Sequence, residues 1–153
     1  RLLEGPLPIR SLTVMVQKEA AVRITAAPGT RECGAISAAV WYYSTPKLLF
    51  PVSRGSFLPA PAVDSAVIRL ALPQELPEDL PPREDFFAVV RAGFGQRRKT
   101  MLNSLSAGLR WEKDATRALL TAAGIAENTR AEQVTLEQWK ALTRAYFSMK
   151  KSR

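Results

Sequence analysis

An aromatic residue followed by two alternate prolines is the strongest sign of a binding site in this sequence. The segment reads Phe57-Leu-Pro-Ala-Pro-Ala-Val-Asp-Ser65. Each proline fixes its own φ angle and disfavours the helical conformation in the residue before it, so a stiff, extended loop is expected. Such a loop can hold the Phe57 ring at a fixed place beside a sheet edge. The alternative interpretation places Phe57 in the hydrophobic core, where most aromatic residues lie.

A second candidate site is the basic segment Gln96-Arg97-Arg98-Lys99-Thr100, which we expect inside a helix. The surrounding sequence from Phe86 to Trp111 holds five basic residues and no acidic residue. Neutralisation of phosphates by Arg97, Arg98 and Lys99 is a natural use of such a cluster. The alternative is a solvated run of charges. Three adjacent helical residues span about 300°, so at least one of the three is expected near the buried face.

Three consecutive aromatic residues, Trp41-Tyr42-Tyr43, form a third feature with two interpretations. Aromatic rings can stack on unpaired bases. They can equally pack against the sheet that the neighbouring segments predict, which is the commoner reason for such residues.

The shortage of cysteine and histidine excludes several kinds of chemistry. The chain has one cysteine, Cys33, and no histidine. A disulfide within the chain, a zinc site and mechanisms based on histidine are therefore excluded. Since no histidine can activate its thiol, Cys33 is expected to be a packed, small apolar residue. We predict no metal site in this chain.

The overall charge favours a polyanionic partner. The 153 residues carry a formal net charge of +8, with a pI near 10.2. Nucleic acid is the first candidate partner and an anionic membrane surface the second. No apolar run approaches the roughly 20 residues that cross a bilayer, and no export signal is visible, so a cytoplasmic location is expected. The opening Arg1-Leu-Leu-Glu4 resembles the tail of an amphipathic helix, so we expect a fragment.

Short segments of β-forming residues alternate with helical segments in the first half of the chain. Strands are predicted at residues 11–16, 47–52 and 66–72, the first of them buried, and helices at 17–27 and 35–43. This order is typical of the last part of an α/β sheet.

A linker and a helical domain are predicted to follow. Residues 73–83 are rich in proline and acidic residues, so they divide an α/β domain at 1–72 from a helical domain at 84–153. Residues 83–109 predict a helix that Gly93 and Gly95 break or kink. A second helix at 112–123 is closed by Gly124. A third begins at the capping box Thr135-Leu-Glu-Gln138, runs to about Met149, and has Trp139, Leu142 and Tyr146 as its apolar face.

Together these segments resemble the ribosomal RNA adenine dimethyltransferases, especially the bacterial branch that acts on the small subunit. The proline loop is fairly specific for these enzymes, and the basic segment with Asn103 and Leu105 is more specific for the small-subunit branch. The resemblance covers nearly the whole chain and is carried, in the family's order, by the stretches at 15–24 (MVQKEAAVRI), 34–43 (GAISAAVWYY), 57–70 (FLPAPAVDSAVIRL), 94–105 (FGQRRKTMLNSL) and 119–139 (LLTAAGIAENTRAEQVTLEQW).

The resemblance implies the C-terminal part of a Rossmann-like methyltransferase sheet followed by a small helical domain. The complete protein would transfer methyl groups from S-adenosylmethionine to the exocyclic amines of adjacent adenines in small-subunit (16S) ribosomal RNA. Phe57 is expected to pack on the target base, and Arg97, Arg98 and Lys99 to face the RNA. A base must leave its stack to react, which fits a ring presented by a stiff loop. A monomer bound to the small ribosomal subunit or its precursor, without a membrane, is implied.

The family's glycine-rich donor turn and its Asn-Leu-Pro-Tyr catalytic motif are absent from this sequence. The nearest glycine pattern, Gly93-Phe-Gly95, follows a helical stretch and lacks a third glycine. We therefore expect no residue of this chain to bind the donor, and no activity from the chain alone. An RNA- or ribosome-binding module that acts in subunit assembly without chemistry is the alternative function. The segment 96–100 disfavours a methyltransferase for DNA or large-subunit RNA.

Overall fold

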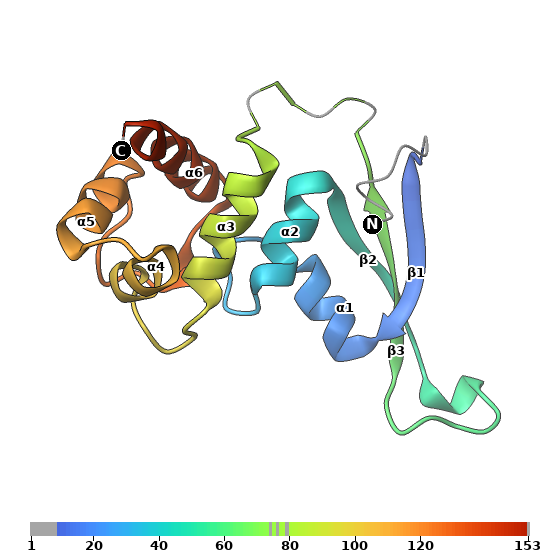
Figure 1. Cartoon of the computed structure of the whole chain (residues 1–153). Helices are drawn as coiled ribbons and strands as arrows, with labels where there is room; N and C mark the ends of the chain where they lie inside the picture. The colour runs from blue at the N-terminus through green and yellow to red at the C-terminus, as the bar shows by residue number, and fades with distance from the viewer. Residues whose placement is uncertain (1–8, 74, 76, 79, 153) are drawn as a thin grey trace.

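The computed structural model describes residues 9–73, 75, 77, 78 and 80–152. A three-stranded sheet and two helices form the first part, and four helices form the second (Figure 1). The helix tail expected at Arg1–Glu4 lies outside the described residues.

The sheet has the order β1-β3-β2, with β3 antiparallel to both neighbours. Its strands β1 (Ser11–Gln17), β2 (Thr45–Val52) and β3 (Ser65–Ala71) match the three predicted segments to within two residues. The expectation that the first strand is buried was wrong. Within the described residues β1 is an edge strand, and its residues alternate between half-buried and exposed. Its apolar run reflects one packed face rather than two.

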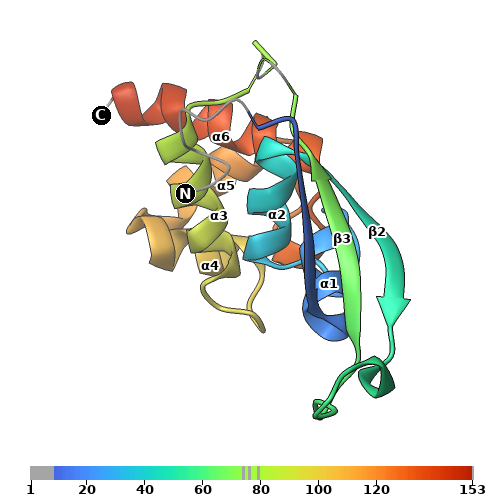
Figure 2. The same cartoon turned by 90° about the vertical axis from the view of Figure 1, so that its right-hand side faces the viewer.

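One face of the sheet is covered by α1 (Lys18–Thr25) and α2 (Ala35–Tyr43) (Figures 1 and 2). The buried residues of this layer come from both helices and from alternate positions of β3: Ala21, Val40, Ala66, Ile68 and Leu70. The opposite face carries no helix of the described part of the chain (Figure 2). There Met15, Val67 and Phe50 pair across the strands, with Met15 50% and Phe50 53% exposed.

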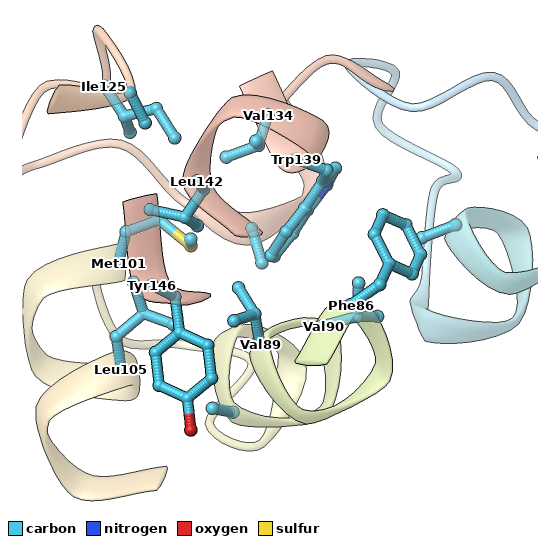
Figure 3. Close-up of a cluster of buried hydrophobic side chains, with 14 of the residues drawn as sticks. Phe86, Val89, Val90, Met101, Leu105, Ile125, Val134, Trp139, Leu142 and Tyr146 are labelled. Atoms are coloured by element: carbon cyan, nitrogen blue, oxygen red, sulfur yellow. The ribbon is translucent and has the colours of Figure 1, made fainter. Parts of the chain in front are cut away.

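The helical part consists of α3 (Arg83–Phe94), α4 (Met101–Leu109), α5 (Lys113–Ala122), the 3₁₀ turn η2 (Ala131–Gln133) and α6 (Leu136–Lys151). Trp139, Leu142 and Tyr146 of α6 are buried as predicted and face Phe86 and Val89 of α3 (Figure 3).

The predicted signals at the helix ends of this part are confirmed. Gly124 follows α5 with a φ of +64°. At the start of α6 the backbone N–H of Gln138 donates to Thr135 Oγ1 at 3.2 Å, and the N–H of Thr135 donates to Gln138 Oε1 at 3.1 Å. These two bonds form the capping box that the sequence predicts.

The aromatic residues of α2 belong to the core of the helical part. Tyr42 and Tyr43 are buried, with the Tyr42 ring 4.6 Å from the Phe86 ring and the Tyr43 ring 5.8 Å from the Phe87 ring. The Tyr42 hydroxyl donates to the carbonyl of Pro81 at 2.9 Å. Stacking on RNA bases is therefore wrong for these two tyrosines. Packing is their role, and its partner is α3 rather than the sheet.

Candidate RNA interface and target-base loop

Phe57 lies on the connection between β2 and β3, which projects from one end of the sheet (Figures 1 and 2). A 3₁₀ turn, η1 (Arg54–Ser56), begins this connection, and the Ser53 side chain caps the turn by accepting from Gly55 N at 3.2 Å. Phe57 follows in extended conformation. Its side chain is half-buried and belongs to neither hydrophobic cluster of the described residues. The ring is thus carried by a loop and is not a core residue.

Hydrogen bonds close the base of this loop. The backbone N–H of Arg54 donates to Asp64 Oδ1 at 2.9 Å, and Arg54 Nη1 donates to the carbonyl of Ala62 at 3.3 Å. The carbonyl of Asp64 accepts from the N–H of Lys18 at 3.0 Å. The two ends of the loop are therefore joined to each other and to the first residue of α1.

The basic segment forms a loop between α3 and α4, and the expectation that it lies within a helix was wrong. Helix α3 ends at Phe94, beside the two glycines expected to interrupt it, and α4 begins at Met101. Arg97, Arg98 and Lys99 are all exposed. Because the three residues do not follow helical geometry, none of them has to face the core.

The loop that carries this segment is held by several hydrogen bonds. The N–H of Lys99 donates to the carbonyl of Gln96 at 2.9 Å, and Asn103 Nδ2 donates to Thr100 Oγ1 at 3.1 Å. The N–H of Met101 donates to the carbonyl of Thr129 at 2.7 Å. The three cations are therefore presented from a tight, anchored turn.

Arg97 and Arg98 line a groove of about 1030 Å³ between this loop and the first two helices. The groove is basic, with six cationic side chains against three acidic ones. The cationic residues are Lys18, Arg23, Arg31, Arg97, Arg98 and Arg130, and the acidic residues are Glu19, Glu32 and Glu132. A concave surface with excess positive charge concentrates a polyanion. Lys99 is not among the lining residues.

Sequence reasoning missed Arg23, Arg31 and Arg130 as parts of this surface. They come from α1, from the segment after α1 and from the residue before η2. Each is an isolated arginine in the sequence, so no local cluster marks it. Arg23 and Arg130 lie in two of the stretches that carry the family resemblance. That resemblance was the one sequence signal that could have marked them as candidates for RNA binding.

The groove continues toward the Phe57 loop. A smaller pocket of about 370 Å³ is lined by residues of that loop, Arg54, Ala62, Val63 and Asp64, together with Gln17, Lys18 and Glu19. Lys18 and Glu19 line both hollows. The Phe57 loop and the basic loop are therefore at the two ends of one concave surface, with the start of α1 between them.

Cys33 lines the groove but is buried, with 7% of its surface exposed. Burial raises the pKa of its thiol above the ordinary value of 9.0, and this outweighs the hydrogen bond from Ser37, which lowers it. The thiol is protonated at neutral pH. Because the thiolate is the nucleophilic form, this environment favours a packing role.

Among the described residues, neither a glycine-rich turn between a strand and a helix nor a cluster of metal-binding side chains occurs. Gly93 packs against α6, where a Cβ atom would approach Trp139 Cη2 to 2.5 Å. This glycine therefore serves helix packing and not a phosphate cradle. No group of three metal-binding side chains occurs in the described part of the chain. Among the same residues, no helix combines the length and the apolar character that a membrane span requires.

The sequence matches the family model for ribosomal RNA adenine dimethylase over residues 1–147. It is 48% identical over 144 residues to the ribosomal RNA small subunit methyltransferase A of Alkaliphilus oremlandii, covering 93% of this chain and 50% of that relative. The protein of the same name from Pelotomaculum thermopropionicum is 46% identical over 155 residues, covering 94% and 52%. The chain thus spans about half the length of the curated relatives that it matches.

Two solved structures share the fold. A dimethyladenosine transferase from Plasmodium falciparum superposes with a TM-score of 0.74 at 19% identity, over 96% of this chain and 61% of that one. The 23S rRNA methyltransferase ErmE superposes with a TM-score of 0.64 at 26% identity, over 94% and 57%. The predicted fold, the C-terminal part of a methyltransferase sheet followed by helices, is confirmed. With the family model spanning most of its length, this chain belongs to the ribosomal RNA adenine dimethylase family.

Proposed function

We propose that this chain is the RNA-binding half of an S-adenosylmethionine-dependent methyltransferase that dimethylates the exocyclic amines of adjacent adenines in small-subunit ribosomal RNA. One observation supports this function above the others. The pocket beside the Phe57 loop and the basic groove share Lys18 and Glu19, so a single surface can hold a target base at one end and phosphates at the other. The relatives at 41–48% identity are named small-subunit enzymes.

Phe57 is the residue proposed to contact the target base. The loop presents a half-buried ring outside the core, and other residues of the same loop, Arg54, Ala62, Val63 and Asp64, line the smaller pocket. An adenine that has left its stack loses its aromatic neighbours, and a ring can replace them. Covering the base orients its amine, and orientation is the main contribution that this chain's residues can make to methyl transfer.

The groove is proposed to bind the RNA backbone through Arg97 and Arg98, with Arg23, Arg31 and Arg130 extending the surface. Lys99 lies on the same exposed loop, outside the groove, and is proposed to reach an adjacent phosphate. The donor supplies an electrophilic methyl group when bound. The described residues contain no glycine-rich turn between a strand and a helix, so no donor contact is assigned to this chain. A cytoplasmic monomer bound to the small ribosomal subunit or its precursor is part of the proposal.

The second candidate is a ribosome-binding module that acts in subunit assembly without chemistry. It is favoured by the presence of a basic groove in a chain whose described residues contain no glycine-rich turn between a strand and a helix. The two functions differ in one respect that can be measured, which is whether RNA binding leads to methylation.

The test uses a full-length enzyme that carries this chain as its C-terminal half. Small subunits that lack the modification are incubated with the methyl donor, and dimethyladenosine is measured by mass spectrometry of the RNA. Phe57→Ala should lower turnover by about 10- to 100-fold, since stacking on an aromatic ring contributes roughly 1–3 kcal/mol. Phe57→Tyr keeps the ring and should retain most of the activity.

Phe57→Leu is the matched control for ring stacking, because leucine fills similar space without a π face. Its turnover should fall nearly as far as that of Phe57→Ala. The melting temperature of each variant is measured alongside, since a core aromatic truncated to alanine typically loses about 3–5 kcal/mol of stability. A stable Phe57→Ala enzyme with normal turnover would contradict base stacking. Binding of small subunits with no dimethyladenosine formed by the wild-type enzyme would favour the assembly module.

A further inference from the structure

The loop that carries Phe57 has little apolar packing to fix its shape. Leu58 is 101% exposed and Val63 is 48% exposed. Phe57 itself lies outside both hydrophobic clusters of the described residues. Burial of apolar surface is the usual source of a unique conformation, and here it contributes little. The position of the Phe57 ring must therefore depend on the prolines and on hydrogen bonds at the base of the loop.

Asp64 makes two of those hydrogen bonds, one on each side of the loop. Its side-chain Oδ1 accepts from the backbone N–H of Arg54 at 2.9 Å, which joins the last residue of the loop to η1, the turn that precedes Phe57. Its carbonyl accepts from the N–H of Lys18 at 3.0 Å, which joins the loop to α1. A carboxylate is a strong acceptor for a backbone N–H. The side chain of Asp64 thus closes the loop, and its backbone ties the closed loop to the concave surface.

Phe57 is close in sequence to the point that Asp64 holds. The N–H of Phe57 donates to the carbonyl of Arg54 at 3.3 Å, and the N–H of Arg54 is the group that Asp64 accepts from. A chain of two hydrogen bonds therefore runs from the Asp64 carboxylate through Arg54 to the backbone of Phe57. Without the first bond, Arg54 of η1 keeps only its longer side-chain hydrogen bond, from Nη1 to the carbonyl of Ala62 at 3.3 Å, across the base of the loop.

We propose that Asp64 is a positioning residue: its carboxylate fixes η1 and thereby holds the Phe57 ring against the target adenine. This role rests on the proposed function of Phe57. The carboxylate does not touch the base and takes no part in proton transfer. Its effect is to place the ring before the base arrives, and a catalytic group displaced by about 1 Å can cost about 100-fold in rate.

Asp64→Ala and Asp64→Asn form a matched pair for testing this role in the full-length enzyme. Both remove the negative charge, so any electrostatic effect on RNA binding is the same in both. Only asparagine keeps an Oδ1 that can accept from Arg54. Asp64→Ala should lower kcat by about 10- to 100-fold with KM for small subunits changed less than about threefold. Asp64→Asn should restore most of kcat. Asp114→Ala, which removes an exposed acid of α5, is the control for loss of a carboxylate elsewhere.

A double-mutant cycle with Phe57→Ala shows whether Asp64 acts through the ring. Residues that act through one contact give non-additive effects. In the Phe57→Ala background, Asp64→Ala should therefore cost less than about twofold more. The proposal is overturned if Asp64→Ala alone keeps normal kcat, if asparagine fails as badly as alanine, or if the two effects on kcat multiply. If Phe57→Ala alone keeps normal turnover, the proposed function of Phe57 is what fails.

A second pair of variants changes the donor of the same hydrogen bond, the backbone N–H of Arg54. This pair tests the role of the bond even if Asp64→Ala does not fold. Arg54→Pro removes the N–H that Asp64 accepts from, and Arg54→Ala keeps it. Ser53, with φ −64° and ψ 141°, already has the conformation that a residue before proline prefers, and the first position of a helical turn tolerates proline. Arg54→Pro should lose about tenfold more kcat than Arg54→Ala. Equal activities of the two variants would overturn the role of this bond.

Discussion

At the scale of single residues, only part of the predicted basic cluster lines the groove. Arg97 and Arg98 line it, and Lys99 does not. Removing one cation that neutralises a phosphate should reduce the slope of log K against log salt by about 0.7–0.9. We expect that reduction for Arg97→Ala, Arg98→Ala and Arg130→Ala, measured by filter binding to small-subunit RNA across a salt series.

The control for this series is Lys113→Ala, which removes one positive charge from the exposed start of α5. Its slope should stay close to that of the wild type, because Lys113 does not line the groove and is not proposed to contact a phosphate. If Arg130→Ala behaves like this control while Arg97→Ala does not, the RNA contacts the basic loop and not the groove as a whole.

A second prediction at this scale concerns the Cys33 thiol. Burial raises its pKa above 9.0. The neutral thiol is therefore favoured in the folded state, and this contribution to stability is present below the unfolded pKa and lost as pH rises through the folded pKa. Compared with Cys33→Ala, the wild type should lose more stability between neutral pH and values above 9.0, as measured by urea unfolding.

Alkylation gives an independent check on that thiol. At neutral pH, iodoacetamide should label native Cys33 more slowly than the unfolded chain by about tenfold or more, because the buried thiol is protonated and shielded. Equal rates in the two states, read by mass spectrometry, would mean that the side chain is open to the groove.

The sequence points to the candidate site residues that a local pattern marks, and their roles stay predictions. Phe57 is marked by its prolines, and Arg97, Arg98 and Lys99 by their clustering. Arg23, Arg31 and Arg130 were not predicted, because the groove that brings them together depends on how α1, η2 and the α3–α4 loop pack. The same holds for Asp64, whose partner Arg54 is ten residues away across a loop.

At the scale of elements, the helices α3 and α4 approach closely at Gly108. A Cβ atom at this position would lie 2.6 Å from both Cα and Cβ of Ala92. Gly108→Ala should therefore destabilise the chain by about 1–3 kcal/mol despite the better helix propensity of alanine. Thermal or urea unfolding measures this change. Ala107→Ser, at the exposed neighbouring position, should stay within about 0.5 kcal/mol.

The helix ends that carry explicit local signals were predicted well. Helix α6 follows its capping box, and α5 is closed by Gly124. The helix expected over residues 83–109 divides into α3, which ends at Phe94 directly before Gly95, and α4, which begins at Met101. The apolar periodicity of Phe94, Met101 and Leu105 continues across the break, since both helices pack on the same core, and periodicity alone could not show the loop.

At the scale of the whole molecule, the chain is expected to bind RNA but not the methyl donor. Its described residues lack a glycine-rich turn between a strand and a helix, and Gly93 is committed to packing against Trp139. Calorimetry of the chain with S-adenosylmethionine should give no saturable heat. Micromolar, saturable binding would show that a donor site exists among residues with other proposed roles.

The aromatic cluster between α2 and α3 also affects whether the helical domain can be replaced by that of another family member. The linker at residues 73–83 is the natural place to cut between the two predicted domains, and that division stays a prediction. Tyr42 and Tyr43 pack on Phe86 and Phe87 from the other side of that cut. A helical domain taken from a relative would therefore have to pack against Tyr42 and Tyr43 of this chain. A helical domain exchanged at the linker therefore has to keep aromatic partners for both tyrosines at the positions of Phe86 and Phe87.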